Sequence, residues 1–176
     1  MPIFLNFNGS ILEVGGGNNP LRGGNGEKIS VNMDVSDSPL VDVRHDASVY
    51  PWPFNAETFD NVYSAYCLEH VSWRDVRKYI AEIYRVLKKG GNAVLFTPNT
   101  LEQCKWVIEH GGGDEEASKM LFGGQEFPNH AGAHKNFLSP EWAKRLFEEA
   151  GFMDVKIIPH PATPTDMIIQ VRKKGA

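Results

Sequence analysis

The chain has 176 residues, of which 41% are hydrophobic and 23% are charged, and its formal net charge is −4. These values are typical of a globular protein, and we expect residues 1–176 to form a single domain. The slightly acidic charge gives no reason to expect binding to nucleic acid or to an anionic membrane. No apolar run reaches the length of about 18 residues that a membrane span needs. The first residues lack a secretory signal and the two cysteines fit a reduced compartment, so a cytoplasmic location is expected.

Short apolar strands alternate along the chain with helical patterns, which predicts a mostly parallel sheet. Strands are expected at 11–14, 29–33, 41–44, 61–65, 93–97, 155–158 and 167–171. The clearest helix is predicted over 73–88, where apolar residues recur at spacings of three and four. A second helix is predicted to begin at Ser139, with Pro140 in the favoured first position. The last two strands are separated by a short proline-rich segment, so we expect them to pair antiparallel.

Two connections between the expected strands are unusual. Residues 20–28 contain three glycines and residues 46–59 contain two prolines, so the helices expected there are short or absent. The stretch 98–138 is long and non-periodic, with room for two short helices. Long segments of this kind in compact domains are typically lids or binding loops. We therefore predict that residues 99–138 form a lid or a substrate-facing insertion.

The most informative stretch is 11–20, ILEVGGGNNP, which is typical of a strand that ends in a nucleotide-binding turn. Glycines allow positive φ angles and let a ligand approach the main chain closely. Twenty-one residues after Glu13, a second apolar run ends in Asp34. In nucleotide-binding α/β folds, an acidic residue at about this distance binds ribose hydroxyls.

Four blocks together resemble the small, type 11-like members of the class I S-adenosylmethionine-dependent methyltransferase family. In order, the blocks are Glu13-Val-Gly-Gly-Gly17, then Asp34, then Val43-Arg-His-Asp46-Ala47, and finally residues 59–71, FDNVYSAYCLEHV. The resemblance covers about residues 11 to 172, and the combination is more specific than any single motif. It implies an α/β fold with a Rossmann-like doubly wound sheet of about seven strands. This sheet is expected to be mostly parallel with an antiparallel last strand, and to carry helices on both faces.

The resemblance also implies a site for S-adenosylmethionine. The expected contacts are Glu13, Gly15, Gly16, Gly17 and Asn19 at the glycine turn, Asp34 on the ribose, Asp46 and Ala47 on the adenine, and Tyr66 beside the sulfonium. Asn19 stands where the family pattern has a third glycine, so this side of the pocket is expected to be open.

The implied reaction moves a methyl group from the sulfonium to an O, N or C atom of a small-molecule acceptor. Holding the acceptor in line supplies much of such a catalysis, and a general base is needed only if the acceptor loses a proton. His70 and His134 are the candidate catalytic residues, while Glu69 and His130 are candidates for contacts with the acceptor. No group of potential ligands has zinc-like spacing, so no metal site is predicted.

Other interpretations of these residues stay open. The glycines, Asp34 and Asp46 also fit ordinary turns, and Glu69 and His70 could simply open the next helix. A nicotinamide-dependent oxidoreductase would also use a glycine turn and a ribose carboxylate, although Pro20 replaces its third glycine. A non-catalytic member of the fold, which binds a cofactor or a partner chain, would explain the shortened connections. A homodimer is a further expectation, because a second subunit could supply acceptor contacts.

Overall fold

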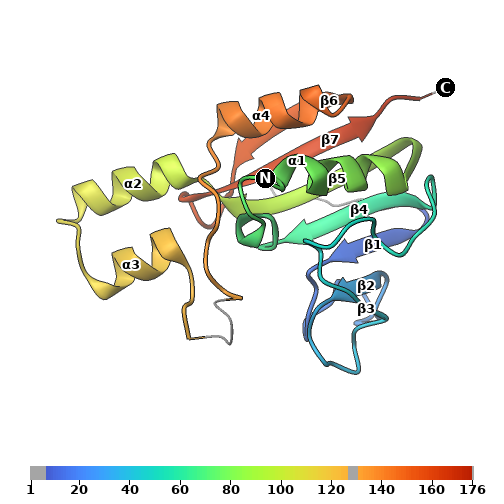
Figure 1. Cartoon of the computed structure of the whole chain (residues 1–176), viewed down its shortest axis with the longest axis horizontal. Coiled ribbons are helices and arrows are strands. Elements are labelled where there is room, and N and C mark those ends of the chain that lie inside the picture. Colours follow the sequence, from blue (N-terminus) through green and yellow to red (C-terminus); the bar gives the residue numbers. More distant parts are fainter. Residues whose placement is uncertain (1–6, 127–130, 176) are drawn as a thin grey trace.

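The computed structural model describes residues 7–126 and 131–175. Seven strands form one sheet in the order β3-β2-β1-β4-β5-β7-β6 (Figure 1). The strands are β1 Ile11–Val14, β2 Val31–Asp34, β3 Val43–Arg44, β4 Phe59–Ala65, β5 Leu87–Pro98, β6 Phe152–Pro159 and β7 Asp166–Lys173. The pairs among β1 to β5 are parallel, and β7 runs antiparallel to both β5 and β6. The predicted mixed, mostly parallel Rossmann-like sheet is confirmed.

Four α-helices and one 3-10 turn complete the described elements. They are η1 Leu68–His70, α1 Val76–Val86, α2 Thr100–Glu109, α3 Glu115–Phe122 and α4 Pro140–Glu149. Helix α4 begins as predicted, because the Ser139 side chain accepts a hydrogen bond from the Trp142 amide at 3.2 Å and Pro140 occupies the first turn. Helix α1 is shorter than predicted: Ser72 and Asp75 first form a turn, and β5 starts at Leu87, directly after the helix. No helix in the described residues is long and apolar enough to cross a membrane.

Helices α1 and α4 cover one face of the sheet. The Tyr79 hydroxyl of α1 is hydrogen-bonded to the Ser64 hydroxyl of β4 at 3.0 Å, and Phe147 of α4 packs on Phe152 of β6 with ring centroids 5.5 Å apart. The buried core lies between these two helices and β1, β4, β5 and β7. Burial of these apolar side chains is the main stabilising term of the domain.

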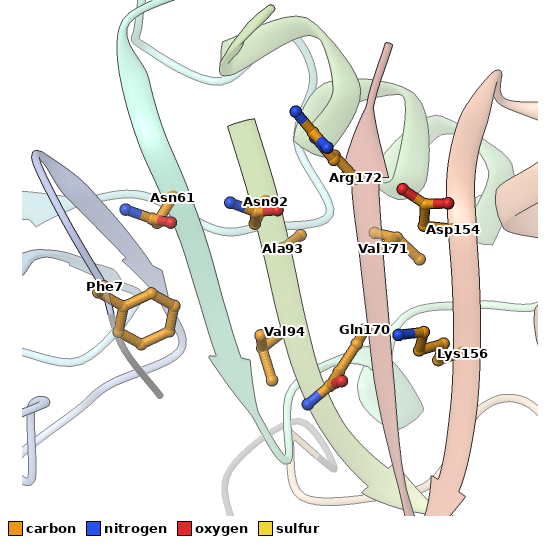
Figure 2. Close-up of a pocket in the computed structure, with 10 residues that line it drawn as sticks. All are labelled: Phe7, Asn61, Asn92, Ala93, Val94, Asp154, Lys156, Gln170, Val171 and Arg172. Carbon is orange, nitrogen blue, oxygen red and sulfur yellow. The ribbon is translucent and has the colours of Figure 1, made fainter. Parts of the chain in front are cut away.

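Several described connections between the first strands carry no helix, as the sequence predicts for residues 20–28 and 46–59. In the described part of the chain, the connections from β1 to β2, β2 to β3 and β3 to β4 contain no helix, because their glycines and prolines do not sustain one. Polar side chains such as Asn92, Gln170 and Arg172 line an open cavity of about 460 Å³ on β4, β5, β6 and β7 (Figure 2). None of the predicted cofactor residues lines this cavity.

Candidate functional site

The glycine turn follows β1, next to the ends of β2 and β4. Gly15 has a φ angle of +85°, and a Cβ atom placed on it would lie 2.7 Å from the Cβ of Cys67. A Cβ on Gly16 would lie 2.6 Å from Oδ1 of Asn32. Real Cβ atoms do not approach other atoms so closely, so both positions require glycine. The backbone of the turn is thereby left bare for a ligand.

Glu13 fixes the segment that follows the turn. Its buried carboxylate accepts hydrogen bonds from the Leu21 amide at 2.7 Å and from the Ser30 hydroxyl at 2.6 Å. The Asn32 side-chain amide in turn donates to the Gly17 and Leu40 carbonyls, each at 3.0 Å. These bonds hold the turn without a following helix. Glu13 is therefore in a position to orient the glycine turn.

Asp34 ends β2 and faces the turn. One of its carboxylate oxygens accepts from the Gly17 amide at 3.1 Å, and the other accepts from the Ser36 amide at 2.7 Å. Each oxygen can accept more than one hydrogen bond. The half-buried carboxylate is therefore held in position and can still accept from a ligand hydroxyl.

Two adjoining cavities share Gly15 and Tyr66. The first, of about 440 Å³, is lined by Gly15, Asp34, Asp46, Ala47, Tyr66 and His70, together with Val35, His45, Ser48, Cys67, Val71, Ala131 and Lys135. The second, of about 530 Å³, is lined by Glu13, Gly15, Gly16, Asn19, Pro20, Leu21, Arg22, Tyr63, Ala65 and Tyr66. Of the predicted cofactor contacts, only Gly17 lines neither cavity, and its amide is bonded to Asp34 instead.

Tyr66 follows β4 and separates the two cavities. Its φ angle of +53° is unusual for a residue with a side chain, and its hydroxyl donates to Oδ2 of Asp166 at 2.9 Å. Burial and this bond raise the pKa of the Tyr66 hydroxyl, so it stays protonated. The bond holds an otherwise strained residue in place.

Three ionisable side chains meet beside the first cavity, namely Glu69, His70 and His134. Their candidate ligand atoms all lie within 4.8 Å of one another, and the two imidazole rings have centroids 5.5 Å apart. Burial raises the pKa of Glu69 to about 7 and lowers the pKa of both imidazoles. The sequence interpretation named all three side chains, and the structure brings them together. His130 lies outside the described residues.

Residues 133–136 dock onto the turn that carries Glu69 and His70. The Lys135 amide donates to the Glu69 carbonyl at 2.8 Å, and the Asn136 side chain donates to the carbonyls of Leu68 at 2.8 Å and Val71 at 2.9 Å. Sequence reasoning missed Lys135 and His45 as cavity residues. Lys135 follows the predicted His134 and His45 precedes the predicted Asp46 in the chain, and this adjacency could have pointed to both residues.

Comparisons with known proteins identify the family of the chain. Residues 3–157 match the family described as "Methyltransferase domain". No curated protein matches the chain in sequence.

The solved structures below resemble the chain in fold. A SAM-dependent methyltransferase from Thermotoga maritima, described as a possible histamine N-methyltransferase, has a TM-score of 0.65 at 20% identity, over 97% of this chain and 84% of that one. A SAM-dependent methyltransferase from Archaeoglobus fulgidus has a TM-score of 0.63 at 17% identity, over 93% and 86%. The Burkholderia thailandensis 1,6-didemethyltoxoflavin-N1-methyltransferase, solved with that substrate and S-adenosylhomocysteine, has a TM-score of 0.60 at 16% identity, over 94% and 71%.

The family match covers most of the chain and disfavours the nicotinamide-dependent alternative. The matched range includes residues 59–71, the fourth block of the resemblance. The chain belongs to the methyltransferase-domain family and is an S-adenosylmethionine-dependent methyltransferase of the class I fold.

Proposed function

We propose that this protein transfers a methyl group from S-adenosylmethionine to an O, N or C atom of a small-molecule acceptor. The observation that carries the proposal is the pair of cavities joined at Gly15 and Tyr66. Asp34 and Asp46 line one cavity, and the cluster of Glu69, His70 and His134 lies at its side. A donor site and an acceptor site are thus adjacent.

The residues present fit the methyl donor. The bare backbone at Gly15 and Gly16 leaves room for its amino-acid part, and the carboxylate of Asp34 can accept from the ribose diol. Asp46 and Ala47 line the same cavity and are placed to meet the adenine. Bound S-adenosylmethionine supplies an activated methyl group on a sulfonium, a cation that an aromatic ring such as Tyr66 attracts.

The acceptor is proposed to lie against Glu69, His70 and His134. These side chains would orient its reacting atom, and orientation is the main demand of a transfer from an activated donor. The solved relative from Burkholderia thailandensis has bound 1,6-didemethyltoxoflavin, and the one from Thermotoga maritima is described as a possible histamine N-methyltransferase. These names support a small-molecule acceptor for this chain too.

The insertion and the quaternary state stay predictions. A groove of about 630 Å³ lies beside the helices α2, α3 and α4. Exposed or half-buried apolar side chains line it together with Cys104, namely Trp73, Leu121, Phe122, Phe137 and Trp142. Closure of residues 99–138 over the acceptor, or a second subunit, would cover such a surface. A cytoplasmic location likewise stays a prediction.

Calorimetric titration with S-adenosylmethionine tests the donor site, with NAD as the comparison ligand. We expect binding of S-adenosylmethionine alone, and a roughly 10- to 100-fold weaker affinity in Asp34→Ala, because hydrogen bonds to a charged group are lost. Asp37→Ala is the matched control, since this exposed carboxylate forms only a long ion pair with Arg44 at 3.6 Å. Equal affinities of both variants would overturn the assignment of Asp34.

Turnover separates the enzyme from a non-catalytic binder of the same fold. Formation of S-adenosylhomocysteine is measured with panels of small hydroxyl, amine and activated carbon acceptors. We expect His134→Ala to lose turnover with the accepted compound and to keep donor binding. Unchanged turnover in this variant would remove His134 from the acceptor site.

A further inference from the structure

Among the described residues, the buried carboxylate of Glu69 has no cationic partner. Its side chain is 4% exposed, and none of the ion pairs among the described residues includes it. Its carboxylate accepts a hydrogen bond from the Thr97 hydroxyl at 3.2 Å. Burial of an unpaired charge is costly, so carboxylates in such positions are usually paired or bind a metal ion.

Two imidazoles lie close to this carboxylate, and the carboxylate of Asp166 is a further group that acts to raise its pKa. His70 is adjacent in the chain, and His134 comes from the docked segment about 65 residues later. The three donor atoms lie within 4.8 Å of one another. A metal ion about 2.0 to 2.2 Å from each ligand requires donor atoms about 3 to 4 Å apart, so small side-chain rotations complete the site.

A hydrogen bond of the His70 imidazole prepares it as a ligand. Nδ1 of His70 lies 3.1 Å from the Ala133 carbonyl, which can only accept, so Nδ1 carries the proton and Nε2 keeps its lone pair. Metal-binding histidines typically donate their other ring N–H to a carbonyl or a carboxylate in this way. Backbone groups of Met120 and Leu121 near the ring of His134 act to raise its pKa, although burial outweighs them and lowers it.

We propose that Glu69, His70 and His134 bind a divalent transition-metal ion. Two imidazoles and one carboxylate form a set that suits Zn²⁺, Fe²⁺ and related ions, and three protein ligands leave coordination positions open. Because His70 also lines the cavity that holds Asp34 and Asp46, the ion would lie beside the proposed methyl-donor site. The ion would bind an oxygen or nitrogen atom of the acceptor and hold it in line with the methyl group.

This role for the ion rests on the proposed function, whereas its binding does not. A ligand role also replaces the general-base role predicted for His70 and His134, since an imidazole nitrogen bound to a metal has no lone pair for a proton. An acceptor hydroxyl bound to the ion loses its proton to water more readily, because the positive charge stabilises the oxyanion. A metal ion at this position implies a small-molecule acceptor that has a metal-binding oxygen or nitrogen atom at, or next to, the methylated position.

Metal binding is measured on the metal-stripped full chain without S-adenosylmethionine. Zn²⁺ is followed by calorimetry, and Co²⁺ by its visible absorption, which reports the number of ligands. We expect one ion per chain, and an affinity at least about 10-fold weaker in Glu69→Gln and in His134→Ala. His110→Ala is the matched control, because this exposed histidine stacks on Trp106 outside the cluster and its loss should change nothing.

Donor binding in the same samples separates the two proposals. If metal binds and S-adenosylmethionine does not, the proposed function fails while the metal site stands. Binding of S-adenosylmethionine to the parent and to both variants shows that all three are folded. In that case, absent or substoichiometric metal binding by the parent overturns the metal site. Equal metal affinity in the parent, Glu69→Gln and His134→Ala would overturn it as well.

Discussion

At Gly15 the main chain has a φ angle of +85°, and a Cβ atom placed there would lie 2.7 Å from the Cβ of Cys67. We expect Gly15→Ala to lower the free energy of unfolding by roughly 2 to 4 kcal/mol, from backbone strain and overpacking together. Urea denaturation measures the change. Gly24→Ala is the control, because no atom lies within 4 Å of its Cβ position, and a change within about 0.5 kcal/mol is expected. Equal effects of the two substitutions would contradict the prediction.

The cluster of Glu69, His70 and His134 beside the cavity is unusual because burial shifts the pKa values of its side chains. Glu69 has a pKa raised to about 7 by burial, and burial also raises the pKa of Asp166, which accepts from Tyr66. Strongly shifted pKa values gather at functional sites because such sites place ionisable groups in partly dry surroundings. Here they gather at the ends of β4 and β5 and at the start of β7, next to the glycine turn.

At the scale of elements, helix α1 stabilises the connection that lacks a helix of its own. The Glu82 carboxylate accepts from the Trp52 amide at 2.6 Å and pairs with Arg85 at 2.7 Å. The Arg85 guanidinium donates to the carbonyls of Trp52 at 3.1 Å and Phe54 at 2.8 Å. Two charged side chains of one helix thus hold the proline-rich segment that follows Asp46 and Ala47.

This clamp predicts a pH dependence of stability. Burial acts to raise the pKa of Glu82, but the bonds from Arg85 and Trp52 outweigh it and hold this pKa below the ordinary value of 4.5. As the pH falls, Glu82 therefore takes up a proton in the unfolded state before it does so in the folded state. The contribution of Glu82 to the free energy of unfolding is fully present above pH 4.5 and is lost as the pH falls to the lower pKa of the folded state.

We expect Glu82→Gln to lower the free energy of unfolding by roughly 1 to 3 kcal/mol at neutral pH, since a charge-assisted pair is lost. The difference from the parent should shrink as the pH falls through this window. Urea unfolding at a series of pH values measures it. Glu116→Gln on the exposed surface of α3 is the control, and it should leave the curve unchanged. A difference that is constant across the pH series would contradict the clamp.

At the scale of the whole molecule, the proposed donor site joins segments that come from distant parts of the chain. Its lining residues follow β1, β2, β3 and β4, and Ala131 and Lys135 come from the insertion. A ligand that contacts all of them binds only the folded state. Binding therefore stabilises the domain as a unit.

We expect S-adenosylhomocysteine at about 100 times its Kd to add about 2.7 kcal/mol of stability. For a chain of this size, that corresponds to a rise in melting temperature of roughly 5 to 10 °C. Thermal scanning with NAD at the same concentration should show no shift. A parent protein that shows equal shifts with both ligands would speak against a specific methyl-donor site.

Local motifs carried most of the fold prediction. The strand that ends at Val14, the glycines after it and the carboxylate of Asp34 are close in sequence, and their backbone demands act within a few residues. The same holds for the N-terminus of α4 at Ser139. The start of α1 was predicted less well, because a turn at Ser72 competed with the helix.

The amino-acid sequence by itself determined the type of sheet, the glycine turn after β1 and the absence of helices in the glycine-rich and proline-rich connections, because short-range backbone preferences govern all three. The tertiary structure alone decided which sheet face stays open and which side chains meet beside the donor cavity. Tyr66 meets Asp166, 100 residues away, and His134 reaches Glu69 only because Asn136 and Lys135 bind backbone groups of the turn at Leu68–Val71. Such meetings depend on how a long, non-periodic segment docks, and no local periodicity encodes that docking.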